Sequence, residues 1–70
     1  MKVNHQALQA LREARGLSKS DLANRVGIHP SQITRLERGH QGATLQTLED
    51  LARVLSVELP ALVADGEDVA

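Results

Sequence analysis

The sequence predicts an all-α protein, a compact bundle of four to five short helices. Every recurrence of apolar side chains follows the period of a helix, and no stretch shows the alternation of a half-buried strand. The chain of 70 residues also contains no Phe, Trp or Tyr, the aromatic residues that favour strands. Glycine and proline, which interrupt regular structure, fall between the apolar segments.

The first two helices are predicted by apolar spacing and by a cap. The first is expected near residues 4–15, where apolar residues recur at one-turn spacing around Leu8. The second is expected at residues 19–26, because Ser18 can cap a helix whose first turn contains Asp21. A serine in this position accepts a hydrogen bond from a backbone N–H that lacks a partner inside the helix.

The remaining helices follow the same signals. The third is expected near residues 30–38, because its initial proline suits the first position of a helix. The fourth is expected at residues 45–55, which carry the longest apolar stripe and follow the capping residue Thr44. A short fifth helix is expected near residues 59–64.

Length and charge indicate one domain with a tail. A chain this short forms a single small domain, expected at residues 1–64. Residues 65–70 form an acidic tail that we expect to be disordered. The net charge is +3 over residues 1–56 and −4 over residues 57–70. A mildly basic body is compatible with a polyanionic partner but does not identify one.

Composition excludes several classes of function. Without cysteine the chain has no disulfides, no thiolate metal site and no thiol catalysis, and the expected setting is the reducing cytoplasm. The three histidines, His5, His29 and His40, lack the spacing of metal ligands. No nucleotide-binding or hydrolase motif and no membrane-spanning run occurs. We therefore expect no enzyme, no cofactor, no small-molecule ligand and no membrane contact.

The second and third helices are joined by a very short connection. Only Gly27, Ile28 and His29 separate them, which predicts the sharp corner of a helix-turn-helix. Gly27 stands where the chain must leave a helix with a positive φ, and Ala23 is small where two crossing helices approach. The apolar residues expected to meet inside the corner are Leu22, Val26, Ile28, Ile33 and Leu36.

The outer face of the third helix has the chemistry of a DNA reader. A helical wheel places Ser31, Arg35 and Arg38 opposite the core side, flanked by Gln32 and Thr34, with no acid among them. Such a face offers hydrogen bonds to base edges and positive charge to phosphates. For an isolated helix an ordinary solvated face is the better interpretation, but the tight corner favours DNA binding.

The run from Leu17 to Leu62 resembles the Cro/C1-type helix-turn-helix domain of phage repressors and bacterial regulators (the XRE family). The resemblance rests on LSKSDLA (17–23), VGI (26–28), SQITRLERG (31–39) and TLQTL (44–48). It implies a lambda-repressor-like bundle that inserts helix 30–38 into the major groove. The implied function is a sequence-specific, repressor-like transcriptional regulator that binds double-stranded DNA.

The resemblance also implies residue roles. The positions that match base readers are Pro30, Ser31, Gln32, Thr34 and Arg35. The positions that match phosphate contacts are Lys19, Arg38, His40, Gln41 and Thr44. Arg12 and Glu37 match an internal ion pair that ties the first helix to the third, and the wheel places both at the edge of the core.

Several residues depart from the family pattern, and Glu58 and Pro60 make the fifth helix less conventional. Pro30 has no side-chain hydrogen bond to offer, so base specificity is expected to depend on Ser31 and Arg35. His29 replaces the usual small polar cap, which leaves the cap of this helix open or passes it to a water. Ser56 stands where relatives commonly have the glycine that ends the fourth helix.

Two questions stay open at the level of sequence. The apolar residues Val54, Leu59, Leu62 and Val63 fit either the core or the interface of a homodimer on a palindromic operator. The alternative function is a protein-interaction module, such as an antitoxin-like partner of a toxin, and a protein partner is compatible with either function.

Overall fold

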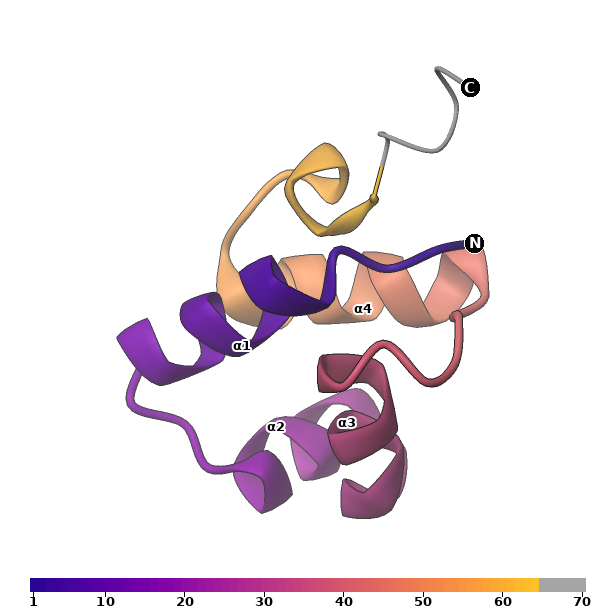
Figure 1. Ribbon diagram of the computed structural model, residues 1–70. Coiled ribbons are helices and arrows are strands. Elements are labelled where there is room, and N and C mark those ends of the chain that lie inside the picture. Colours follow the sequence, from indigo (N-terminus) through magenta and orange to yellow (C-terminus); the bar gives the residue numbers. More distant parts are fainter. Residues whose placement is uncertain (65–70) are drawn as a thin grey trace.

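The computed structural model describes residues 1–64, which fold into four α-helices and one short 3-10 helix around a single core (Figure 1). The elements are α1 (His5–Ala14), α2 (Lys19–Val26), α3 (Pro30–Glu37), α4 (Leu45–Leu55) and η1 (Leu59–Leu62). The predicted all-α bundle is confirmed, and the bounds of α1 to α4 agree with the expected ones to within one residue. The acidic tail expected at residues 65–70 lies outside the described residues.

Aliphatic side chains fill the core. Because the chain has no aromatic residue, leucine and isoleucine supply almost all of the buried volume. The largest fully buried side chains are Leu8, Leu22, Ile33, Leu36, Leu48, Leu51, Leu55 and Leu62. They come from all five helices, so the position of each helix depends on the others. No helix in this part of the chain has the length and apolar character needed to cross a membrane.

The predicted caps of α2 and α4 are present. Ser18 Oγ accepts the Asp21 N–H at 2.9 Å, and the Asp21 carboxylate accepts the Ser18 N–H at 3.2 Å. These hydrogen bonds lower the pKa of Asp21 below its ordinary value. Their contribution to stability is therefore complete at a pH above the ordinary pKa, and it is lost as the pH falls through the lowered pKa of the folded state. Thr44 Oγ1 accepts the Thr47 N–H at 3.2 Å at the start of α4.

The expected fifth helix is wrong in type and length. Residues 59–62 form a 3-10 helix, and Val63 is extended. The proline at its start cannot donate a backbone hydrogen bond, and Val63 instead pairs with Val3 in an isolated β-bridge. This pairing buries Val3, a core residue to which the sequence pattern assigned no role. The chain start thus packs against η1 (Figure 1).

Ser56 ends α4 in a left-handed conformation, with φ of 60°. This backbone region is strained for any residue with a Cβ and unstrained for glycine.

We expect Ser56→Gly to raise the free energy of unfolding by about 0.5–1 kcal/mol, because the relief of strain exceeds the added freedom of the unfolded chain. The measurement is urea unfolding followed by circular dichroism. Ser20→Gly is the matched control, because glycine at this exposed position inside α2 is expected to destabilise by a similar amount. A loss of stability in Ser56→Gly would contradict the prediction.

Candidate nucleic-acid interface

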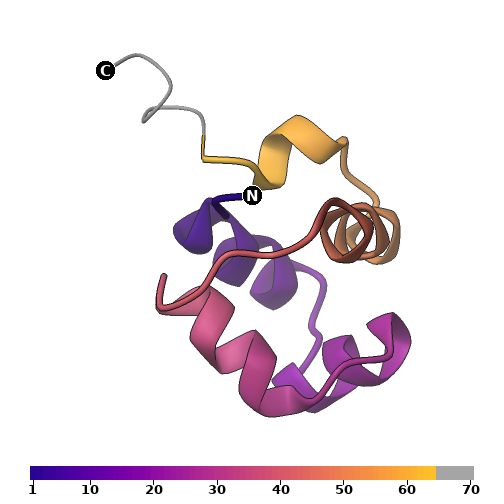
Figure 2. The ribbon, with the colours of Figure 1, turned by 90° about the vertical axis from the view of Figure 1, so that its right-hand side faces the viewer.

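The corner between α2 and α3 holds α3 on one face of the molecule. Gly27 has φ of 86°, and the N–H groups of Gly27 and Ile28 both donate to the Ala23 carbonyl, at 2.8 and 3.0 Å. Ala23 is fully buried, and Ile28 packs against the core. Figure 2 shows α3 crossing the face turned to the viewer, with the start of α4 beside it.

His29 caps α3 with its own side chain, which answers the question that the sequence left open, and the cap does not pass to a water. Its Nδ1 accepts the backbone N–H of Ser31 at 3.1 Å. In return, the Gln32 side-chain oxygen accepts the backbone N–H of His29 at 3.1 Å. The imidazole nitrogen takes the place of the oxygen of a shorter polar side chain. A backbone N–H at the start of α3 therefore keeps a hydrogen-bond acceptor.

The outward face of α3 carries the predicted polar and basic side chains. Ser31, Arg35 and Arg38 are exposed, whereas Pro30, Gln32 and Thr34 are half-buried. Within residues 1–64, neither arginine of this face forms an ion pair. Their charges are therefore not neutralised by an acid of the described chain.

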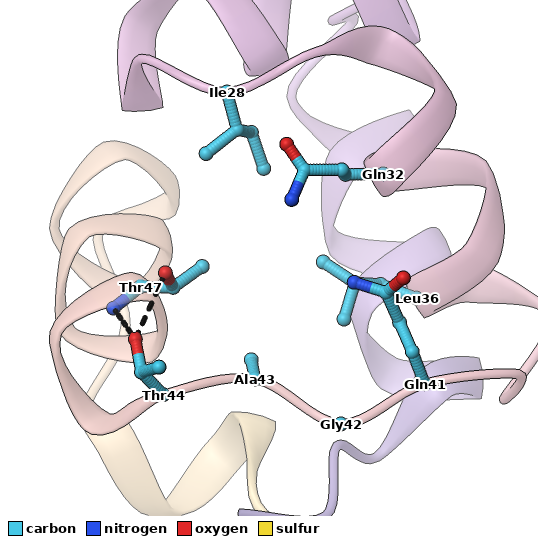
Figure 3. Close-up of a pocket in the computed structure, with 8 residues that line it drawn as sticks. All are labelled: Ile28, Gln32, Leu36, Gln41, Gly42, Ala43, Thr44 and Thr47. Carbon is cyan, nitrogen blue, oxygen red and sulfur yellow. Dashed lines mark hydrogen bonds between the residues drawn. The ribbon is translucent and has the colours of Figure 1, made fainter.

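A hollow of about 140 Å³, lined by both polar and apolar residues, separates α3 from the start of α4 (Figure 3). Gln32 projects into it from α3, Gln41 rises from the loop, and Thr44 and Thr47 border it on the other side (Figure 3). Because the Gln32 oxygen is bonded to His29, its NH₂ group is the end left to donate outward. Of the other predicted phosphate contacts, Lys19 is half-buried and His40 is exposed.

A second hollow, of about 300 Å³, brings together residues that the sequence pattern did not combine. Lys2 and His5 line it beside His40 and Gln41 of the loop. The first residues reach this loop because Ala43 N–H donates to the Met1 carbonyl at 2.9 Å. No spacing rule predicts such a contact, since it depends on how the start of the chain packs.

Arg12 and Glu37 form a buried ion pair between α1 and α3. Arg12 Nε donates to Glu37 Oε2 at 2.6 Å, and a second guanidinium nitrogen donates to Oε1 at 3.2 Å. The third nitrogen donates to the Leu17 carbonyl at 2.8 Å, so the pair also fixes the turn before α2. The hydrogen bonds with Glu37 raise the pKa of Arg12. Both residues are less than a tenth exposed.

The predicted dimer residues divide into two groups. Leu62 is fully buried in the core of its own chain, so its side chain is not available to a second subunit. Val54, Leu59 and Val63 are half-buried against the core and keep part of their apolar surface outside. Of the two interpretations open for Leu62, the core is the correct one.

Comparisons with known proteins agree with this geometry. The family model described as helix-turn-helix matches residues 8–62. The phage CTXphi transcriptional repressor RstR of Vibrio cholerae is 33% identical over 60 residues, which are 86% of this chain and 54% of RstR. A second curated relative matches over 28% of its length, so this chain spans about a quarter to a half of these relatives.

Solved structures share the fold. The restriction-modification controller protein C.AhdI of Aeromonas hydrophila has a TM-score of 0.77 and 35% identity, with 81% of this chain and 86% of that protein covered. SinR, a master regulator for biofilm formation solved in complex with DNA, has a TM-score of 0.76 and 32% identity, with 80% and 90% covered. HppE also contains the fold (TM-score 0.79, 30% identity), but 86% of this chain covers only 34% of HppE.

The family match includes the corner, the outward face of α3 and the ion pair behind it. The chain therefore belongs to the Cro/C1-type helix-turn-helix family, as the resemblance of its sequence predicted.

Proposed function

We propose that the chain is a sequence-specific, repressor-like transcriptional regulator that binds double-stranded DNA and reads the major groove with α3. The observation that carries the proposal is the acid-free outward face of α3, held by a tight corner and by a buried ion pair. RstR is a transcriptional repressor and SinR was solved with DNA, which supports the same role here. A face of this kind suits both base edges and phosphates.

The proposed contacts follow from exposure and chemistry. Arg35 reads guanine, because its planar fork matches the O6 and N7 acceptors. The remaining proposed base readers are Pro30, Ser31, Gln32 and Thr34. The proposed phosphate contacts are Lys19, Arg38, His40, Gln41 and Thr44, which border α3 at the start of α2 and around the loop before α4.

We also propose that two copies act together on a palindromic operator. One recognition helix covers too few base pairs to select a site among some 10⁶–10⁹ competing genomic sites. Two helices about 34–36 Å apart would read two half-sites. The proposed contact surface contains Val54, Leu59 and Val63, which keep apolar surface outside the core.

The proposed setting is the cytoplasm, where bacterial DNA is accessible, and residues 1–64 act as the DNA-binding domain. The proposal includes no enzymatic step. Within residues 1–64, no group of three or more His, Asp or Glu side chains is placed to hold a metal ion. The hydrogen bonds of Arg12 to Glu37 and to the Leu17 carbonyl give this ion pair a structural role instead of a catalytic one.

Arg35→Ala tests the proposed function. We expect the variant to lose about 1–3 kcal/mol of discrimination at one base position, because the bidentate contact to guanine disappears. The measurement is titration of fluorescent duplexes that carry each base at each position. Arg38→Ala is the comparison, because loss of a phosphate contact weakens all duplexes alike. Equal losses on specific and random DNA in Arg35→Ala would exclude base reading by Arg35.

A further inference from the structure

One ring nitrogen of His29 lies within hydrogen-bond distance of two groups of the same α3 residue. The backbone N–H of Ser31 donates to His29 Nδ1 at 3.1 Å, and the Ser31 hydroxyl oxygen lies 2.9 Å from the same nitrogen. Both residues are exposed at the start of the helix proposed to enter the major groove. Whether the Ser31 hydroxyl donates or accepts a hydrogen bond therefore depends on whether Nδ1 carries a hydrogen.

The backbone donor fixes that state. An amide N–H can only donate, so Nδ1 must carry a lone pair, and the imidazole proton is on Nε2. The Ser31 hydroxyl then donates its hydrogen to Nδ1, because otherwise two lone pairs would face each other at 2.9 Å. A protonated Nδ1 would place its hydrogen against the Ser31 N–H. The neutral imidazole is thus the form that satisfies both contacts.

With its only hydrogen directed at His29, the Ser31 oxygen can act outward only as an acceptor. A free serine hydroxyl can donate or accept and therefore pairs with any base edge. In the major groove the donors are the N6 amino group of adenine and the N4 amino group of cytosine. Guanine O6 and N7 and thymine O4 are acceptors, and they would face a lone pair of Ser31.

We propose that His29 makes Ser31 a reader of amino groups, so that Ser31 selects adenine or cytosine at one position of the operator. The inference rests on the proposed DNA-binding function and adds to it the chemical group that Ser31 recognises. His29 is a positioning residue here, because it acts through Ser31.

The place of this base relative to the one read by Arg35 follows from the helix. Ser31 and Arg35 are four residues apart, so they lie on one face about 6 Å apart along the axis. Base pairs are about 3.4 Å apart. The amino group should therefore lie within one or two base pairs of the guanine read by Arg35.

The experiment uses binding sites selected from random duplex DNA by the wild-type protein and by three variants. In Ser31→Ala, preference at one position is expected to disappear while the remaining motif stays. In His29→Ala, the freed hydroxyl can donate, so guanine and thymine should become acceptable at that position. In His29→Asn, which keeps a short polar cap with an acceptor oxygen, the preference for adenine or cytosine should remain.

A base analogue tests the contact itself. Replacing the selected adenine by purine, or the selected cytosine by 2-pyrimidinone, removes only the amino group. The wild-type protein should lose about three- to tenfold in affinity, as for one neutral hydrogen bond, and Ser31→Ala should lose nothing further. Melting curves of all variants check that α3 stays folded at the assay temperature.

Several outcomes would overturn the inference. Amino-group reading by Ser31 would be excluded by a Ser31-dependent preference for guanine or thymine. An unchanged motif in Ser31→Ala would exclude it as well. In both cases the wild-type protein would still select a motif, so the proposed DNA-binding function would stand. An unchanged preference in His29→Ala would exclude the role of His29. If the wild-type protein selected no motif at all, the proposed function and this inference would fail together.

Discussion

Replacing Arg12 by alanine is expected to lower the free energy of unfolding by about 3–5 kcal/mol, because Glu37 would be left as a buried, unpaired charge. Arg12 also donates to the Leu17 carbonyl, so the turn before α2 loses a hydrogen bond as well. Glu37→Ala should be similarly destabilising, since the guanidinium would lose both hydrogen bonds to Glu37 and keep only a 3.7 Å contact with the exposed carboxylate of Glu13. Chemical unfolding monitored by circular dichroism measures both effects.

The double variant and a surface pair provide the controls. Arg12→Ala combined with Glu37→Ala should lose less than the sum of the single variants, because neither charge is then left alone. Arg53 also pairs with an acid, Asp50, but its side chain is 69% exposed. Arg53→Ala should therefore change stability by less than about 1 kcal/mol. Additive losses for Arg12 and Glu37 would mean that the two residues do not interact.

Affinity for the operator is expected to fall by about a thousandfold between 50 and 200 mM salt. Each subunit offers about three phosphate contacts, from Lys19, Arg38 and either Arg35 or His40, so a dimer neutralises about six phosphates. At about −0.9 per phosphate, the logarithm of the association constant should fall against the logarithm of salt concentration with a slope near −5. Fluorescence anisotropy at several salt concentrations measures this slope.

Stoichiometry distinguishes the dimer from a monomer. A slope of about −2 to −3 with one chain per duplex would show that a monomer binds, and Val54, Leu59 and Val63 would then be core-supporting residues only. Arg38→Gln should flatten the slope of the dimer by about 2, because it removes one contact from each subunit. Arg53→Gln is the matched control, because Arg53 lies in the last turn of α4, away from the proposed contacts.

The helices and the corner could be predicted because their causes are local. Apolar period, Ser18, Thr44 and Gly27 each act within a few residues of the element that they define. Features that depend on tertiary packing could not be predicted from the pattern. The pairing of Val3 with Val63 joins the two ends of the described chain, and it explains why Val63 is extended instead of helical.

In the candidate site, too, local features could be predicted from the sequence and features that depend on tertiary packing could not. A helical wheel gives the outward face of α3, because side-chain direction in a helix follows from its period. It does not give the cap by His29, since histidine is not among the preferred capping residues and only its local conformation brings Nδ1 to Ser31. Nor does it place Lys2 and His5 beside the loop that contains His40, because that hollow forms only when the chain start packs.

Selection of bound sites from random double-stranded DNA is the decisive measurement, because sequence-specific reading by α3 must leave an enriched motif. We expect a palindrome with half-site centres about one helical turn apart, 10–10.5 base pairs, and a guanine in each half-site that is no longer required by Arg35→Ala. If the protein bound duplex DNA without enriching any sequence, or bound none, sequence-specific recognition by α3 would be excluded. That result would favour a protein-interaction module.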